Sequence, residues 1–504
     1  MYSGGTQPPF FNLLKTKYME IILEIFGFIF GLITNMFHLI LDLFRKSKVF
    51  NAKWGKERSI GRIWNKGLLF SRNRKTTRKA AFENMYISGP TGSGKTARIL
   101  IKQICSLKNC TLIINDPSGE LRKKTSGYLA RRRKPLFLCW TDSRISAGYN
   151  FLSGIKKSSD IHRIAALLVD ATLGKGQSND PFWSLQSKAL IAILIRVVLH
   201  QPEEFQTMPN ILRALKILAV HPNSFDVWVA TSGDKKLILE YKTLLAMPEK
   251  TLMNVIASVK ACLQIFEDED IAAVCSTNSI DFSKIRQEPT VIFLGNSLKD
   301  MKYTSVLTEL FFEQLYGYLL ENQPRKGDLD CFVILEEASS IKIPILPVAV
   351  ANTRKMSVGN VIVSQSFNYL KAIYKEEADN IVTQCGTKLY LPGTTEIETM
   401  KELELLSGLT QFQDENGTHT RPLISAAEVR LLPKNRTIIM QGNKPLVKGR
   451  TAPYFKSLKY RYLTHFKPVD SESPANTEPQ LLMAFEMNEY ESTQQKQSAP
   501  AVSK

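Results

Sequence analysis

The sequence predicts an α/β protein with a predominantly parallel sheet, an inserted all-α domain and an N-terminal apolar helix. Short apolar strands alternate with helical segments between residues 85 and 140 and again after 291, a pattern typical of a parallel sheet covered on both faces. Strand signals vanish over 181–282, where amphipathic helical segments follow one another. Residues 21–44 are almost wholly apolar and contain no proline.

A glycine-rich stretch lies between the first strand, 85–87, and a helical segment, 97–104. It reads Gly89-Pro90-Thr91-Gly92-Ser93-Gly94-Lys95-Thr96 and fits G-x-x-x-x-G-K-[S/T], the phosphate-binding loop of P-loop NTPases. Glycines let backbone N–H groups approach phosphate oxygens, Lys95 can reach the β- and γ-phosphates of ATP, and Thr96 can bind Mg²⁺. The strand–loop–helix context favours this interpretation over a glycine-rich turn with an incidental lysine. The predicted nucleotide-binding residues are Gly89, Pro90, Thr91, Gly92, Ser93, Gly94, Lys95, Thr96 and Ala97.

Two carboxylates follow the apolar run 331–335, at Glu336 and Glu337. A buried strand that ends in acids is the Walker B pattern, in which the first acid holds Mg²⁺ and the second polarises the attacking water. Aspartate is usual at the first position, and a buried strand with a solvated acidic end is the alternative. We predict Thr96 and Glu336 as the metal ligands. A later strand, 361–364, ends at Gln365, whose amide can bond the γ-phosphate or the water.

The turn Asn115-Asp116-Pro117-Ser118-Gly119-Glu120 follows the second strand, and it places acids where the ligand crevice of an open α/β sheet lies.

The charge balance is strongly basic, with a formal net charge of +19 and a pI near 9.4 over 504 residues. This favours a polyanionic partner, either nucleic acid or anionic lipid, and solubility alone is the alternative. The seven cysteines are scattered without a C-x-x-C pair, as expected of reduced thiols in a cytoplasmic compartment. The six histidines show no metal-ligand spacing, so we predict no zinc site.

Residues 21–44 span about 36 Å as a helix, which is enough to cross a bilayer once. Glu24, Asn35, His38 and Asp42 fall on one narrow stripe of that helix, so we predict self-association or a membrane partner along it. A surface-lying amphipathic helix and a soluble core helix are the alternatives. Basic residues dominate 45–80, which predicts an outer N-terminus and a cytoplasmic body. The same residues can touch lipid headgroups or DNA phosphates.

These observations predict six segments. They are a lead-in at 1–20, a transmembrane helix at 21–44, a basic juxtamembrane segment at 45–80, a nucleotide-binding domain at 81–180 and 283–465, an all-α insertion at 181–282, and a polar, disordered tail at 466–504.

Taken together, the motifs resemble the type IV coupling proteins, the membrane-anchored, RecA-like ATPases of conjugative DNA transfer and type IV secretion. The resemblance runs from about Tyr86 to Tyr460. It rests on the phosphate-binding loop, on the Asp-x-x-Gly-Glu pattern that begins at Asp116, and on Asp180-Pro181-Phe182-Trp183 at the start of the all-α domain. Glu336-Glu337, Arg354-Lys355 and Gln365-Ser366 keep the family's order and approximate spacing.

The resemblance implies a ring, of six subunits in the family, on the cytoplasmic face of the bacterial inner membrane. Such a ring receives relaxase-bound DNA or a protein substrate and passes it to the secretion channel. Arg354 would then act in trans on the neighbouring γ-phosphate, and Gln365 would sense the nucleotide. The predicted catalytic residues are Lys95, Glu336, Glu337, Arg354 and Gln365. The single span and Glu336 depart from the family, which has two spans and an aspartate.

Two other functions fit the same sequence. A chromosome translocase at the division septum shares the motor, although such proteins usually carry several spans and a DNA-reading C-terminal module. A membrane adaptor that recruits secreted proteins without hydrolysing nucleotide gains weight from Glu336.

Overall fold

The computed structural model describes residues 25–36, 51–174, 181–295, 299–414, 417–471, 474–475 and 477–484. The chain divides into two units. The larger contains Trp54–Leu403 and Ala426–Lys504, and the smaller contains Met1–Lys53 and Glu404–Ser425.

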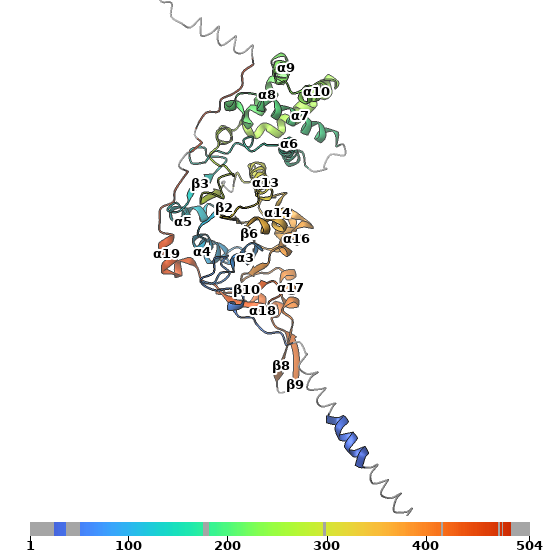
Figure 1. The fold of residues 1–504 in the computed structure, drawn as a ribbon, viewed down its shortest axis with the longest axis vertical. Helices are drawn as coiled ribbons and strands as arrows, with labels where there is room; N and C mark the ends of the chain where they lie inside the picture. The colour runs from blue at the N-terminus through green and yellow to red at the C-terminus, as the bar shows by residue number, and fades with distance from the viewer. Residues whose placement is uncertain are drawn as a thin grey trace, which may run out of the picture. The chain divides into compact units, whose positions relative to one another are not determined.

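A nine-stranded sheet forms the centre of the larger unit, in the order β11-β10-β7-β1-β6-β5-β2-β4-β3. Figure 1 labels its strands β2, β3, β6 and β10. The strands from β7 to β3 in that order run parallel, and β10 and β11 continue the sheet antiparallel at one edge. The strand bounds are β1 Met85–Ser88, β2 Cys110–Asn115, β3 Lys134–Leu138, β4 Thr290–Leu294, β5 Asp330–Leu335, β6 Val358–Ser364, β7 Thr387–Tyr390, β10 Arg436–Gln441 and β11 Val447–Arg450.

Helices cover both faces of this sheet, because its central strands are buried on both sides. Along β2, Ile113 packs into one hydrophobic cluster, whereas Leu112 and Ile114 pack into the other. The second cluster, which includes Leu112, is covered by α4 (Ile101–Ser106), α5 (Glu120–Leu129) and α19 (Leu458–Leu463). The first is covered by α13 (Ser305–Glu321), α14 (Leu346–Asn352), α15 (Phe367–Tyr374) and α16 (Glu377–Thr383). The predicted parallel sheet with two helical layers is confirmed.

The remaining short helices of this part are α2 (Glu57–Ile60), α3 (Arg78–Ala81), the 3₁₀ helices η4 (Thr353–Met356) and η5 (Tyr454–Lys456), α17 (Ile397–Ser407) and α18 (Ala426–Arg430).

A buried polar network ties β1 to β6 and α13. Asn360, fully buried on β6, donates from both its backbone N (3.0 Å) and its Nδ2 (2.8 Å) to Asn84 Oδ1. Its Nδ2 also donates to Thr353 Oγ1, and its Oδ1 accepts from the Tyr316 hydroxyl. Asn84 directly precedes β1, so the network fixes the strand that carries the glycine-rich loop.

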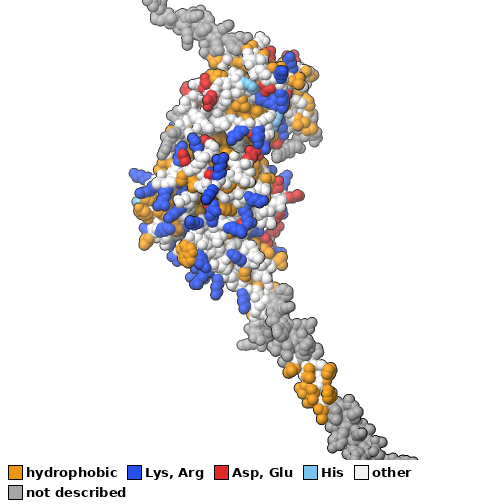
Figure 2. All heavy atoms as spheres, viewed as in Figure 1, with side chains coloured by type: hydrophobic (Ala, Val, Ile, Leu, Met, Phe, Trp, Pro, Cys, Tyr) orange, Lys and Arg blue, Asp and Glu red, His pale blue; other side chains and the backbone are white. Residues whose placement is uncertain are grey.

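Residues 54–82 run along the antiparallel edge and over α4. Gly55 N donates to Leu446 O (2.8 Å), and Arg72 N donates to Arg450 O (2.7 Å). The Glu57 carboxylate accepts from Arg450 N (2.8 Å). Figure 2 shows Lys and Arg side chains crowded over the part of this unit where Figure 1 places α4, α19 and β10, with few acidic side chains among them.

The helical insertion lies between β3 and β4. Its helices are α6 (Ser158–Leu173), α7 (Phe182–Leu199), η2 (Glu203–Phe205), α8 (Met208–Val220), α9 (Pro222–Thr231), α10 (Lys235–Leu245), α11 (Glu249–Leu263), η3 (Gln264–Glu267) and α12 (Glu269–Val274). It therefore begins with α6, earlier than the predicted start at 181, because the apolar face of α6 packs on α7.

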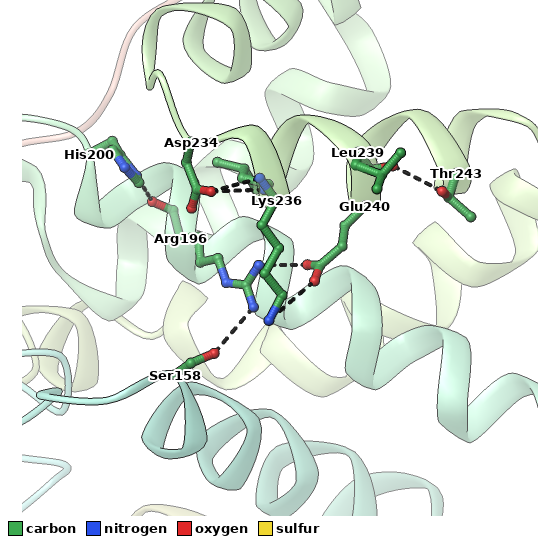
Figure 3. A network of polar contacts seen from close by, with 9 residues as sticks. Ser158, Arg196, His200, Asp234, Lys236, Leu239, Glu240 and Thr243 are labelled. Atoms are coloured by element: carbon green, nitrogen blue, oxygen red, sulfur yellow. Dashed lines mark hydrogen bonds and ion pairs between the residues drawn. The ribbon is translucent and has the colours of Figure 1, made fainter.

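One buried arginine joins three helices of the insertion (Figure 3). Arg196 on α7 pairs with Glu240 on α10 at 2.6 Å and donates to Ser158 at the start of α6 at 3.3 Å. Asp234 caps the same α10 by accepting from Lys236 N and Leu237 N. A buried guanidinium needs such partners, since leaving it unpaired costs several kcal/mol, about 3–5 in other proteins.

Part of the predicted disordered tail packs on α5 and β3, within the larger unit. Val469 N donates to Ser126 Oγ (3.1 Å), and Asp470 pairs with Arg122 (2.5 Å). Phe137 N, on the edge strand β3, donates to Ser471 Oγ (2.9 Å). This stretch protects the sheet edge from pairing with another chain.

The tail then reaches the helical insertion. Asn210, fully buried on α8, donates to Gln480 O (2.8 Å) and accepts from Leu482 N (2.9 Å). The prediction of disorder is therefore wrong for the described residues 466–471, 474–475 and 477–484. Backbone groups make most of these contacts, and a polar composition does not reveal them. Residues 485–504 lie outside the described part.

The smaller unit contains a helix and a hairpin. Ile25–Met36 form an apolar helix, and β8 (Leu409–Asp414) pairs antiparallel with β9 (Gly417–Pro422). The rest of the predicted span 21–44 lies outside the described residues, as do Glu24, His38 and Asp42 of its polar stripe. Among the described helices, α7 alone is long and apolar enough to cross a bilayer, and 56% of it is buried in the insertion.

We expect Asn360→Leu to lower the free energy of unfolding by about 2–4 kcal/mol, because Tyr316 and Thr353 lose a buried partner. Asn352→Leu is the matched control: Asn352 is exposed at the end of α14 and bonds only locally to Val348 O, so its loss should stay within about 0.5 kcal/mol. Denaturant unfolding of both variants measures this. Equal stabilities would contradict the assigned role of the network.

Candidate active site

The glycine-rich loop joins β1 to a helix that begins at Lys95. Gly92 and Gly94 have φ of +79° and +90°, a backbone region that favours glycine. A Cβ on Gly94 would lie 2.7 Å from the Arg98 side chain. The first turns of the helix, Lys95–Leu100, are π-helical before α4 continues them, and such bulges often occur at functional sites. The loop therefore has a tight curve that depends on its glycines.

Lys95 lies inside this loop. Its Nζ donates to Gly89 O at 2.6 Å and to Pro90 O at 3.4 Å, so the ammonium group sits in the concave side of the loop. Burial lowers the pKa of Lys95, and the nearby Glu337 and Glu336 oppose that shift. The position suits a cation that receives phosphate oxygens.

The loop threonine meets the end of β5. Thr96 Oγ1 donates to Glu336 Oε1 at 2.8 Å, although 240 residues separate the two in sequence. Asn115 Nδ2, at the end of β2, donates to Glu336 O at 3.2 Å and fixes the backbone there. The structure thus brings together the two residues predicted to hold a metal.

A second buried carboxylate lies beside Glu336. Asp116 is fully buried and accepts from Arg122 N at 2.7 Å. Burial, with the neighbouring Asp116, raises the pKa of Glu336 to about 8, and burial also raises the pKa of Asp116. Glu336 Oε2 is buried and has no hydrogen-bond partner. A buried carboxylate with an unused oxygen next to a threonine hydroxyl fits a divalent cation such as Mg²⁺, which prefers oxygen ligands.

Glu337 and Gln365 form the other side of the site. Glu337 has φ of +61°, which is rare for a residue with a side chain, and its carbonyl accepts from Ser340 N at 2.8 Å. Gln365 Nε2 donates to Glu337 Oε1, and Thr91 Oγ1 donates to Gln365 Oε1 at 3.2 Å. Backbone strain of this kind is characteristic of functional sites. The Gln365 amide thus links the glycine-rich loop to Glu337.

These side chains line one cavity of about 700 Å³. It is lined by Pro90, Thr91, Gly92, Gly94, Lys95, Thr96, Ala97, Pro117, Ser118, Glu120, Met301, Glu336, Glu337, Ser339, Ser340, Gln365 and Tyr369. The sequence predicted that the turn after β2 lies at the ligand crevice, but it did not predict that Asp116 lies beside Glu336. It also did not predict that Met301 and Tyr369 line the cavity, because neither residue belongs to a motif.

Among the predicted catalytic residues, Arg354 does not line this cavity. It is on η4, before β6, and pairs with Glu83 at 3.0 Å. Glu83 precedes β1, so this pair lies at the amino ends of the parallel strands. The cavity lies at their carboxyl ends. Arg354 therefore cannot serve the cavity of its own chain without a large rearrangement.

Fold and site together define a RecA-like protein with a P-loop. Residues 42–500 match the family described as Type IV secretory system Conjugative DNA transfer, and the chain belongs to that family. No curated protein sequence matches the chain.

Solved structures of the coupling protein TrwB share this fold. The bacterial conjugative coupling protein TrwB in complex with sulphate aligns with a TM-score of 0.63 and 17% identity over 85% of this chain and 96% of that chain. Plasmid coupling protein TrwB in complex with ADP and Mg²⁺ aligns with a TM-score of 0.62 and 16% identity, over 85% of this chain and 96% of that chain. TrwB in complex with a non-hydrolysable ATP analogue aligns with a TM-score of 0.61 and 16% identity, over 85% of this chain and 97% of that chain.

We expect the stability of the metal-free protein to fall as pH rises from about 4.5 to 8. In that range the unfolded chain releases the Glu336 proton while the folded chain keeps it, so folding is increasingly disfavoured. Glu336→Gln removes the contribution of Glu336 to this dependence. The free energy of unfolding of the variant, relative to that of the wild type, should therefore be about 2–4 kcal/mol larger at pH 8 than at pH 5.

Thermal unfolding at both pH values in EDTA measures the effect. Glu376→Gln is the control, because Glu376 is exposed and lies outside the cavity. A Glu336→Gln advantage that does not change with pH would contradict the prediction.

Proposed function

We propose that this chain is an ATP-hydrolysing coupling protein. It is anchored in the bacterial inner membrane, takes up relaxase-bound DNA or protein substrates, and drives them into a type IV secretion channel. The observation that carries the proposal is the 2.8 Å contact between Thr96 and Glu336 in the cavity that Lys95 and Glu337 also line. A buried acid beside the loop threonine is the arrangement needed to hold Mg²⁺ against phosphates.

Each residue of the site has a distinct part in the proposed reaction. Mg²⁺ bound with ATP would neutralise charge on the phosphates. Lys95 exchanges its bond with Gly89 O for bonds to phosphate oxygens, which stabilises the charge that grows on them. Glu337 accepts a proton from the attacking water, and Gln365 orients both the acid and the water. The TrwB complexes with ADP and Mg²⁺ and with ATP and GTP analogues support a nucleoside triphosphate as the ligand.

The position of Arg354 supports an oligomer, a hexamer in this proposal. An arginine at the opposite end of the strands from the cavity can complete the site of a neighbouring subunit in a ring, as arginine fingers do in other NTPases. The basic charge of the chain suits DNA, and the apolar helix at 25–36 suits a membrane anchor within 21–44. The family match favours conjugative transfer over a septal translocase.

We expect the wild type to show ATPase activity that DNA stimulates at low salt and that falls as salt rises, because phosphate contacts release counterions. Lys95→Ala should lose both ATP binding and turnover. Glu337→Gln should keep binding and lose turnover at least about 100-fold, since it removes only the proton acceptor. Lys235→Gln, which changes an exposed charge of the helical insertion outside the cavity, is the control.

Steady-state ATPase assays and equilibrium binding of a fluorescent ATP analogue, on the full chain, separate these effects. If the wild type hydrolysed no ATP with either single-stranded or double-stranded DNA, the result would contradict this proposal and favour the adaptor function.

We expect mixtures of Lys95→Ala and Arg354→Ala subunits to regain ATPase activity that neither variant has alone. Where an Arg354→Ala subunit supplies the loop and a Lys95→Ala subunit supplies the arginine, the shared site is intact. The control is Lys355→Ala, an exposed neighbour, which should remain active on its own. Activity of Arg354→Ala alone at the wild-type level, or mixtures as inactive as their parts, would contradict the in-trans role.

A further inference from the structure

Two stretches of the sequence contain basic residues and no acids. Residues 58–82 contain eight Lys and Arg residues and no Asp or Glu, and 434–467 contain nine and again no Asp or Glu. Almost 400 residues separate their starts. Arg74 pairs with Glu57 and Arg78 pairs with Asp330, both acids from outside the stretches. The other basic residues have no acid within their own stretch, so a surface that they build together carries a positive potential.

The fold joins these stretches into one surface, which we call the basic face. Arg72 N donates to Arg450 O, and the Lys444 ammonium donates to Ser59 O at 2.7 Å. Lys75 lies close enough to Lys459 that the two charges act on each other: burial, then Lys459 and Lys108, lower the pKa of Lys75. Figure 2 shows the resulting concentration of Lys and Arg side chains. Like charges held together in this way favour an anionic partner.

Large apolar side chains project from the same face. Leu458 on α19 is 83% exposed and Trp64 is 74% exposed. Ile63, Phe455 and Tyr462 are also exposed. The Arg62 guanidinium lies 5.6 Å from the centre of the Trp64 ring, and Lys75 N donates to Arg62 O, so Trp64 lies next to the Lys75–Lys459 group. Basic residues with interspersed aromatic and aliphatic side chains are typical of proteins that lie on membranes.

The chain also limits how far this face can be from the predicted membrane span. Phe44 ends that span, and Trp54 begins the larger unit, so about ten residues connect them and reach at most about 35 Å. Trp54 itself is at the basic face: the Lys448 ammonium lies 5.8 Å from the centre of its ring, and Gly55 pairs with Val447. The face is therefore tethered near the bilayer surface.

We propose that the basic face lies on anionic phospholipid headgroups, with Leu458 and Trp64 entering the interface between headgroups and acyl chains. Nucleic acid is the competing partner for a basic surface. Aliphatic side chains such as Leu458 and Ile63 offer no ring for a base to stack on, whereas they gain from leaving water at a lipid interface. The inference rests on the membrane anchor proposed above.

The test places a fluorescent probe on the face of the full chain. The seven native cysteines are buried, so Leu458→Cys can be labelled selectively with an environment-sensitive maleimide. Leu239→Cys, at the 67% exposed Leu239 of α10 in the helical insertion, is the matched control. Both proteins are reconstituted into vesicles of phosphatidylcholine alone or with about 30% phosphatidylglycerol. Quenching by neutral acrylamide then reports exposure to water.

We expect quenching of the Leu458→Cys probe to fall at least about threefold with phosphatidylglycerol and to return at 0.5 M salt, because salt screens surface charge. The probe at Leu239→Cys should not change. Adding Lys456→Gln, Lys459→Gln and Arg461→Gln should abolish the protection, whereas Lys235→Gln, Lys242→Gln and Lys250→Gln, three exposed charges of the insertion, should leave it intact.

Equal quenching in the two kinds of vesicle would overturn the inference, as would protection that appears only when an oligonucleotide is added. Flotation with pure phosphatidylcholine vesicles tests the anchor separately. A chain that floats only with anionic vesicles lacks the anchor but keeps the basic face, and a chain that floats with both yet shows no probe protection keeps the anchor alone.

Discussion

The parallel pairing of β1, β6, β5 and β2 is the constraint on which the candidate site depends. Ser88 pairs with Ser364, Ile362 with Leu335, and Leu335 with Asn115, so four strands end at nearly the same level. Each strand is followed by a functional segment: the glycine-rich loop, Gln365, the two glutamates and the Asp116 turn. Because carboxyl ends of parallel strands share one edge, a site forms there from residues that are far apart in sequence.

This edge brings two buried carboxyl groups together. Asp116 and Glu336 are both buried, and one oxygen of Glu336 has no partner. Two ionised carboxylates buried together are costly, so without a bound cation Glu336 keeps its proton to a higher pH than usual. The longer Glu336 side chain still reaches Thr96, and Asp116 supplies a carboxylate of the usual length beside it. A glutamate at this position is therefore compatible with metal binding.

Positive charge lies on another part of the same unit. The stretches 58–82 and 434–467 pack over α4 and along the antiparallel edge, whereas the acids gather at the carboxyl ends of the parallel strands. The final described residues, 477–484, connect the sheet-bearing part to the helical insertion through Asn210.

The sequence by itself determined the loop at Gly89–Thr96, the strand cores, the start of α7 and the acids at the end of β5, because each depends on a local pattern of glycine, apolar period or charge. Only the tertiary structure decided that Asp116 lies beside Glu336, and that Arg354 lies at the opposite end of the strands from the cavity. It also decided that 467–471 and 477–484 contact α5, β3 and α8. Strand order and backbone hydrogen bonds fix these relations between distant segments, and neither leaves a periodic trace in the sequence.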